Sequence, residues 1–253
     1  MNSMKGDVNL INIIIGAIKV IFLLAFLILI HELGHFIVAK KCKVKVNEFS
    51  IGFGKELWSK QGKETKYTIR LVPLGGYVNM LGENEQVEEE GSFSNSPIWK
   101  RMLIVIAGAA VNILFGLVVF FILACIVNQS ISAGFIVTGR YIVALGQSFV
   151  TLFTGGTEAV SVVGPVGISE MVVQTSGIME FVYLLAVISI SLGITNLLPI
   201  PGLDGGKFLF LIIEAIRKKK MKQTTEAIIT SLGLLALLAI AFVVTSNDIM
   251  SLL

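Results

Sequence analysis

Hydrophobic residues in this chain come in long runs separated by short polar segments. Four runs approach or exceed the roughly 20 residues that a helix needs to cross a bilayer core, and they lie at 10–38, 102–127, 178–198 and 226–245. The first run is too long for a signal peptide and lacks a small-residue cleavage site, so we expect it to remain in the mature protein. The pattern predicts an α-helical polytopic membrane protein with about four transmembrane helices in a single domain over 1–253.

Two interruptions of this pattern predict further structure. Residues 44–80 contain β-type runs and glycine-rich turns at 52–54 and 75–76, which indicates a small membrane-associated β-hairpin after the first span. Two prolines and three glycines break the chain between 199 and 206, so the third span is expected to be a broken one. The apolar segment 141–170 is read as interfacial.

Composition and charge agree with a membrane protein and give it an orientation. The chain is 55% hydrophobic and 15% charged, which excludes an ordinary soluble domain. Of its 20 lysines and arginines, 17 lie within 40–101 and 207–222, on alternate connections. Because basic segments stay cytoplasmic, both termini are predicted to lie outside. The net charge of +3 follows from this bias, and no nucleic-acid partner is expected.

Candidate chemistry is concentrated in the first span, in the sequence His31-Glu32-Leu-Gly-His35. Histidines four apart lie on one face of a helix, so both imidazoles can reach a single Zn²⁺. Glu32 would then stand beside the metal, where it can take a proton from zinc-bound water and pass it to the leaving amine. Ionisable residues inside a span are expensive and mark function. We therefore predict one zinc site with Glu32 as the catalytic base.

A catalytic zinc takes three protein ligands, and no third histidine exists. Asp204 lies in the broken segment Asn196-Leu-Leu-Pro-Ile-Pro-Gly-Leu-Asp204-Gly-Gly206, where freed backbone groups require a protein-lined or watery cavity. It is the candidate third ligand. The alternative is a simple turn in which Asp204 caps the helix that follows.

Together these motifs resemble the site-2 protease family of intramembrane zinc metalloproteases, and within it the bacterial regulator of sigma-E protease branch. The resemblance also rests on Phe49–Gly54, Pro73–Val78 with Gly82-Glu83, Ala107–Asn112 and Gly164–Ile168. It implies zinc ligands at His31, His35 and Asp204 and a base at Glu32. It further implies that Asn196 and Asn112 position the substrate or transition state.

The resemblance implies regulated intramembrane proteolysis in a bacterial cell membrane, with the active site toward the cytoplasm. Its expected substrates are single-span or hairpin membrane proteins of the anti-sigma factor, pro-sigma factor or signal-peptide type. Relatives carry a PDZ domain between the second and third spans, but 128–140 is too short for a domain, which is rarely below about 50 residues. The PDZ domain is therefore expected to be absent here.

Two other readings of the same polar residues remain open. A membrane metal or proton transporter would also use intramembrane His, Glu and Asp on broken helices, and a non-catalytic scaffold would retain the fold alone. The glutamate adjacent to a histidine ligand favours hydrolysis. We further expect the small sheet to clamp unwound substrate by strand pairing; the alternative is a solvated hairpin without substrate contact.

Overall fold

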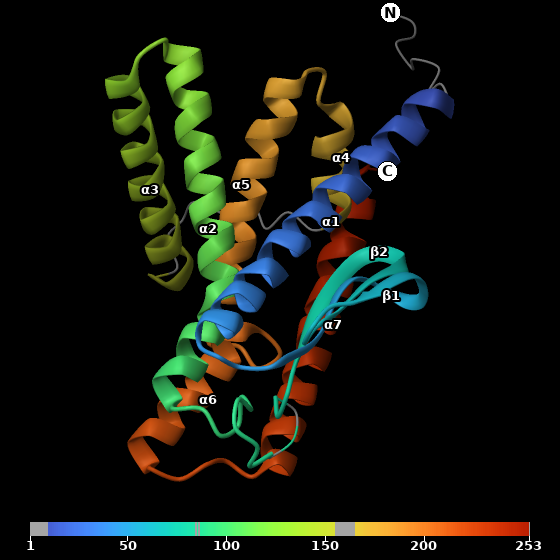
Figure 1. The fold of residues 1–253 in the computed structure, drawn as a ribbon. Helices are drawn as coiled ribbons and strands as arrows, with labels where there is room; N and C mark the ends of the chain where they lie inside the picture. Colours follow the sequence, from blue (N-terminus) through green and yellow to red (C-terminus); the bar gives the residue numbers. More distant parts are fainter. Residues whose placement is uncertain (1–9, 84, 86, 155–164, 253) are drawn as a thin grey trace, which may run out of the picture. The chain divides into compact units, whose positions relative to one another are not determined.

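Helices make up most of the described part of the chain, and four of them correspond to the predicted membrane spans (Figure 1). The computed structural model describes residues 10–83, 85, 87–154 and 165–252. The four helices are α1 (Leu10–Lys41), α2 (Ile98–Asn128), α5 (Ile178–Asn196) and α7 (Gln223–Leu252). Each is long and apolar enough to cross a membrane, which confirms the predicted fold class. Three of them extend past the apolar runs, because a helix does not have to end where its hydrophobic residues do.

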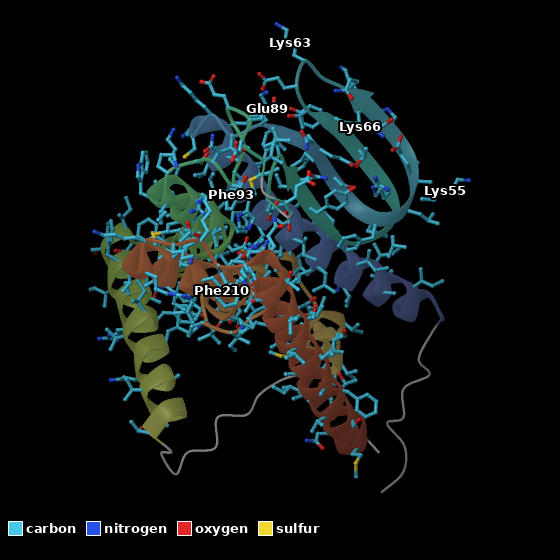
Figure 2. All side chains as sticks on the ribbon, turned by 90° about the horizontal axis from the view of Figure 1, so that it is seen from below. Lys55, Lys63, Lys66, Glu89, Phe93 and Phe210 are labelled. Carbon is cyan, nitrogen blue, oxygen red and sulfur yellow. The ribbon has the colours of Figure 1, made fainter. Side chains whose placement is uncertain are left out.

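The segment after α1 forms the expected small sheet from two long strands, β1 (Val46–Gln61) and β2 (Lys66–Met80). Val46 lies opposite Met80 and Gln61 lies opposite Lys66, as in an antiparallel hairpin. Residues 48–51 of β1 also pair with residues 66–69 of β2, so the hairpin curls back on itself. Figure 2 shows Lys63 at the tip of the hairpin turn and Lys55 at its outer edge.

The curl depends on glycines in β1. Gly52 and Gly54 have φ of +88° and +81°, a region that favours residues without a Cβ. Register shifts fall on both sides of Phe53, between these two glycines. The turns expected at 52–54 and 75–76 are therefore bends within strands, and the chain reverses at 62–65, where the Gly62 N–H donates to the Thr65 carbonyl at 2.9 Å.

The third span is broken, as predicted. α5 ends at Asn196, residues 197–203 form turns, and α6 (Asp204–Arg217) follows. Gly205 and Gly206 let this turn pack onto the start of α6. A Cβ on Gly205 would lie 2.1 Å from the Leu198 carbonyl oxygen, and one on Gly206 would lie 2.4 Å from that of Ile200.

Two further helices, α3 (Ile131–Thr154) and α4 (Pro165–Gln174), lie between the second and third spans. α3 follows α2 after only Gln129 and Ser130. The segment 141–170, expected at the interface, is divided between α3, α4 and residues 155–164, and these last lie outside the described part of the chain.

The chain divides into two compact units, and the unit of residues 24–117 and 186–240 contains the hydrophobic core. In this core the sheet packs on the end of α1, the start of α2 and α6. The buried cluster comprises Ala39, Val44, Val46, Phe49, Val78, Met80, Phe93, Ile104, Val105 and Leu211. This packing fixes the sheet and α6 against the part of α1 that carries the histidines.

The other unit comprises residues 1–23, 118–185 and 241–253. In it, the Lys19 ammonium of α1 donates to the Thr175 carbonyl at 2.8 Å. The rings of Phe120 and Tyr141 stack with centroids 4.4 Å apart and join α2 to α3. Neither histidine belongs to this unit.

Candidate metal centre

The two histidines lie one turn apart on the same face of α1. Their Nε2 atoms are 3.2 Å from each other, and both side chains are largely buried. This arrangement follows from the spacing alone, because residues i and i+4 of an α-helix are neighbours on its surface. α1 therefore presents two ligand nitrogens to one point.

Asp204 meets this point from the first turn of α6. Its Oδ2 lies 3.0 Å from His31 Nε2 and 3.2 Å from His35 Nε2. The residue at the N-cap position of α6 is Leu203, and no side chain caps the helix there. Asp204 is thus not the cap, and the interpretation of this segment as a simple capped turn is wrong.

These three side chains fit a zinc ion. Their ligand atoms all lie within 4.8 Å of one another. Zn–N and Zn–O bonds of about 2.0–2.2 Å and tetrahedral angles place ligand atoms about 3.3 Å apart, close to the separations observed here. The Asp204 Oδ2 is buried and, in spite of the two nearby nitrogens, makes no hydrogen bond of normal geometry. The two imidazole nitrogens and this carboxylate oxygen are the donor set of a hydrolytic zinc site.

Each histidine also has a contact at its second ring nitrogen. His35 Nδ1 lies 2.8 Å from the Ile104 carbonyl oxygen, so Nδ1 carries the hydrogen and Nε2 is free to bind metal. His31 Nδ1 lies 3.4 Å from Nδ2 of Asn112, which is fully buried in α2. α2 therefore orients both imidazoles.

Glycines bring α1 and α2 close enough for these contacts. A Cβ on Gly108 would lie 2.4 Å from His35 Nε2 and 2.8 Å from His31 Nε2. A Cβ on Gly34 of α1 would lie 2.6 Å from the Ala107 carbonyl oxygen. Small residues allow such close helix crossings in membrane proteins. Sequence reasoning included Gly108 in a family motif but did not assign it a role; its place in a Gly-Ala-Ala run within a span is the only local signal.

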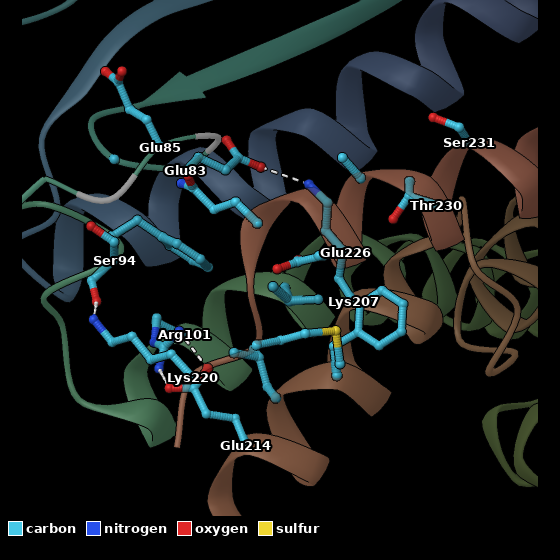
Figure 3. Close-up of a pocket in the computed structure, with 18 residues that line it drawn as sticks. Glu83, Glu85, Ser94, Arg101, Lys207, Glu214, Lys220, Glu226, Thr230 and Ser231 are labelled. Atoms are coloured by element: carbon cyan, nitrogen blue, oxygen red, sulfur yellow. Dashed lines mark hydrogen bonds and ion pairs between the residues drawn. The ribbon is translucent and has the colours of Figure 1, made fainter. Parts of the chain in front are cut away.

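The carboxylate of Asp204 is positioned by contacts that its segment makes with α7, α2 and the loop after β2. The turn before α6 packs on α7, where a Cβ on Gly233 would lie 2.0 Å from the Pro201 carbonyl oxygen. Two ion pairs hold α6 itself, one at each end (Figure 3). Lys207 Nζ lies 2.8 Å from Glu83 Oε1, and Arg101 of α2 pairs with Glu214 through both terminal nitrogens. Burial lowers the pKa of Lys207, but the carboxylates of Glu83, Asp204 and Glu226 together raise that pKa above its usual value.

Glu32 of α1 lies beside a glycine of the sheet. A Cβ on Gly76 of β2 would be 3.3 Å from the Glu32 Cγ and 3.9 Å from a methyl carbon of Ile28. Only a residue without a side chain leaves room beside this glutamate. The predicted base thus faces the backbone of a strand.

The remaining two predicted site residues differ in their contacts. Asn112 touches His31, and its Oδ1 is buried without a partner among the described residues. Asn196 is the half-buried last residue of α5. None of the described hydrogen bonds at the three ligands comes from Asn196, so a role for it in binding substrate stays a prediction.

Comparison with known proteins agrees with this site. A model of peptidase family M50 matches residues 19–240. A Clostridium acetobutylicum protein named "Putative zinc metalloprotease CA_C1796" is 28% identical over 331 residues, covering 91% of this chain and 96% of that protein. A similarly named Fusobacterium nucleatum protein is 27% identical over 329 residues, covering 90% and 97%. Protease RseP of Yersinia pestis is 48% identical over 104 residues, covering 39% and 23%.

Proposed function

Because the chain belongs to peptidase family M50, the site-2 proteases, we propose that it cuts membrane-anchored substrates within or near their transmembrane segments, in regulated intramembrane proteolysis. The chain is a membrane-embedded zinc metallopeptidase. The observation that carries the proposal is the meeting of His31, His35 and Asp204 on a helix that is apolar enough to span the membrane. Ionisable ligands on a candidate membrane span favour a substrate in the membrane.

In this proposal one zinc ion is held by His31 Nε2, His35 Nε2 and the Asp204 carboxylate. Bound there, zinc supplies a Lewis acid that polarises a peptide carbonyl and makes water acidic enough to attack near neutral pH. Glu32 accepts the proton of the attacking water and donates it to the leaving amine. Ile104 and Asn112 keep the two imidazoles in place through their second ring nitrogens.

The sheet is proposed to hold the substrate in an extended form beside Glu32. A helical substrate hides its peptide bonds, so it has to unwind before hydrolysis. Residues 76–80 of β2 pair with residues 46–51 of β1 along one edge, and Gly76 lies against Glu32. An unwound segment that paired along the opposite edge would recover its backbone hydrogen bonds. Its scissile bond would then pass close to the base.

Orientation and partners complete the proposal. The distribution of lysine and arginine supports both termini outside and the metal centre toward the cytoplasm. Anti-sigma factors, pro-sigma factors and leftover signal peptides are the proposed substrate types, and Asn196 is proposed to contact the substrate backbone. A transporter would need polar groups along a path, whereas the described candidate ligands form one tight cluster.

The test uses the purified full chain in detergent with a model single-span substrate. Wild type should hold about one zinc and cleave. Glu32→Gln should keep the metal and lose at least about a hundredfold in rate, because it can no longer accept a proton. Asp204→Asn should weaken zinc binding by more than about tenfold, because a neutral amide is a poorer ligand. Cleavage by Glu32→Gln at the wild-type rate, or no zinc in wild type, would refute the proposal.

A further inference from the structure

A cavity of about 340 Å³ lies in the same unit as the metal centre (Figure 3). Its walls come from the loop after β2, the start of α2, α6 and the start of α7. Lys207 lines it and follows Asp204 by three residues, about one helical turn. Its volume is at the low end of the roughly 300–1,000 Å³ that ligand pockets occupy. The cavity is thus adjacent to the metal centre without containing a metal ligand.

The charged groups of this cavity do not balance. Glu83 and Glu214 are paired with Lys207 and Arg101, as described above. Two more carboxylates, Glu85 and Glu226, line the cavity with no lysine or arginine within ion-pair distance among the described residues. Against them stands one ammonium without a carboxylate, Lys220, which donates to the Ser94 carbonyl at 2.7 Å. The walls therefore favour a cation.

The buried arginine of this cavity is already neutralised. The Arg101 side chain is only 7% exposed, and both its terminal nitrogens go to Glu214. Its Nε–H has no acceptor among the described residues, but this atom is buried, so a ligand in the cavity does not reach it. The charged groups that are open to a ligand are therefore Glu85, Glu226 and Lys220.

We propose that this cavity binds a lysine or arginine residue of the substrate, in the segment that flanks the cleaved span. Its charged end reaches Glu85 and Glu226, and its aliphatic stem lies against Phe93 and Phe210. The proposal rests on the proposed function, because cytoplasmic flanks of membrane spans are rich in lysine and arginine. The cavity would then align the cut by recognising where the membrane span ends.

The experiment compares three single-span model substrates that differ only in two flanking residues: two lysines, two glutamines or two glutamates. The purified full chain with zinc should cleave the lysine substrate with a KM about tenfold below that of the glutamate substrate, since two charge pairs are gained and two repulsions avoided. The double variant Glu85→Gln with Glu226→Gln should bring the three KM values within about twofold, and Glu85→Lys with Glu226→Lys should reverse their order. Glu89→Gln, on the same loop but outside the cavity, is the matched control and should keep the wild-type order.

Each other outcome overturns the inference. If wild type had the same KM for all three substrates, the cavity would not recognise the residues that flank the span. A preference that persists in the double glutamine variant would place the recognition elsewhere, and a lower KM for the glutamate substrate would assign the cavity to an acidic segment. Failure of the proposed function would give a different result, because wild type would then cleave none of the three substrates, the glutamine substrate included.

Discussion

At the scale of single residues, the amide of Asn112 is the least expected part of the site. When His31 binds metal through Nε2, its Nδ1 carries a hydrogen and needs an acceptor. The amide nitrogen faces Nδ1, while the Oδ1 of the same amide is buried without a partner among the described residues. Turning the amide by 180° exchanges the two atoms, so that Oδ1 accepts a hydrogen bond from the His31 Nδ1–H. We therefore expect Asn112 to support the ligand His31, and its role at the substrate stays a prediction.

This arrangement predicts opposite results for two substitutions. Asn112→Asp keeps an acceptor at Nδ1 and should bind zinc at least as tightly as wild type, measured by competition with a chelator. Asn112→Leu should lose about 10–100-fold in affinity, the usual effect of removing a residue that supports a ligand. Ser189→Ala is the control, because the Ser189 hydroxyl donates to the backbone carbonyl of Asn112 and not to its side-chain amide. If Asn112→Leu bound zinc with wild-type affinity, Asn112 would not support the ligand, and a role at the substrate would be its remaining predicted function.

The sequence predicted the histidine pair and Glu32 because their relation is local. Helical periodicity alone sets residues i and i+4 side by side. Asp204 required a second step, from a broken span to a cavity at membrane depth. The contacts of Gly108 and Asn112 could not be derived in this way, since they depend on where α2 crosses α1. That crossing is set by packing between helices, which leaves no periodic signal.

At the scale of elements, the ligands are positioned by helices that cross closely where one of them has a glycine. Gly34 and Gly108 lie between α1 and α2. Gly116 and Gly193 lie where α2 crosses α5, since a Cβ on either would lie 2.6 Å from a carbonyl oxygen of the partner helix. In lipid there is little hydrophobic drive between helices, so close packing of this kind holds them together.

Gly108→Ala should therefore damage the metal site without damaging the helix. Its methyl group would lie 2.4 Å from His35 Nε2, so an imidazole has to move. Zinc affinity should fall by more than about tenfold. Thermal unfolding of the metal-free protein should change little, because alanine favours a helix by about 1 kcal/mol over glycine. Gly146→Ala in α3, where nothing lies within 4 Å, is the matched control. Unchanged zinc binding in Gly108→Ala would contradict the crossing described here.

The sheet was predicted as an element but not in its register. Alternation of apolar and polar residues indicates strands, and the glycines at 52–54 indicate a turn. Glycines serve turns and bulges alike, since both need positive φ. The pairing of residues 48–51 with two different parts of β2 depends on the curl that these bulges permit. The local sequence does not determine which residues of β2 pair with residues 48–51.

At the scale of the whole molecule, charge bias predicts which connections face the cytoplasm. The hairpin turn at Lys63 lies in a basic connection, whereas Ser130 lies in the turn between α2 and α3, in a connection whose one basic residue is Arg140. In a background without Cys42 and Cys125, Ser130→Cys should react with a membrane-impermeant maleimide in intact cells. Lys63→Cys should react only after permeabilisation. The opposite labelling would invert the proposed orientation.

Length also distinguishes this chain from its relatives. Its alignment with the Clostridium protein extends over 331 residues, more than the 253 of this chain, so the relative has segments without a counterpart here. Only two residues separate α2 from α3, and the absence of a PDZ domain at 128–140 stays a prediction. We propose that, without such a domain, substrate choice in this protein depends more on the unit that contains the metal centre.

The glycine crossings make tolerance to mutation very uneven along the chain. At Gly34, Gly108 or Gly193, a single added methyl group meets another helix or a ligand. On the exposed faces of the same spans, side chains such as Val127 of α2 or Ile178 of α5 meet only what surrounds the protein, and any apolar replacement serves. Over many generations the exposed positions are free to drift while the glycines stay fixed. Distant descendants of this protein would share a few small residues and little else of their spans.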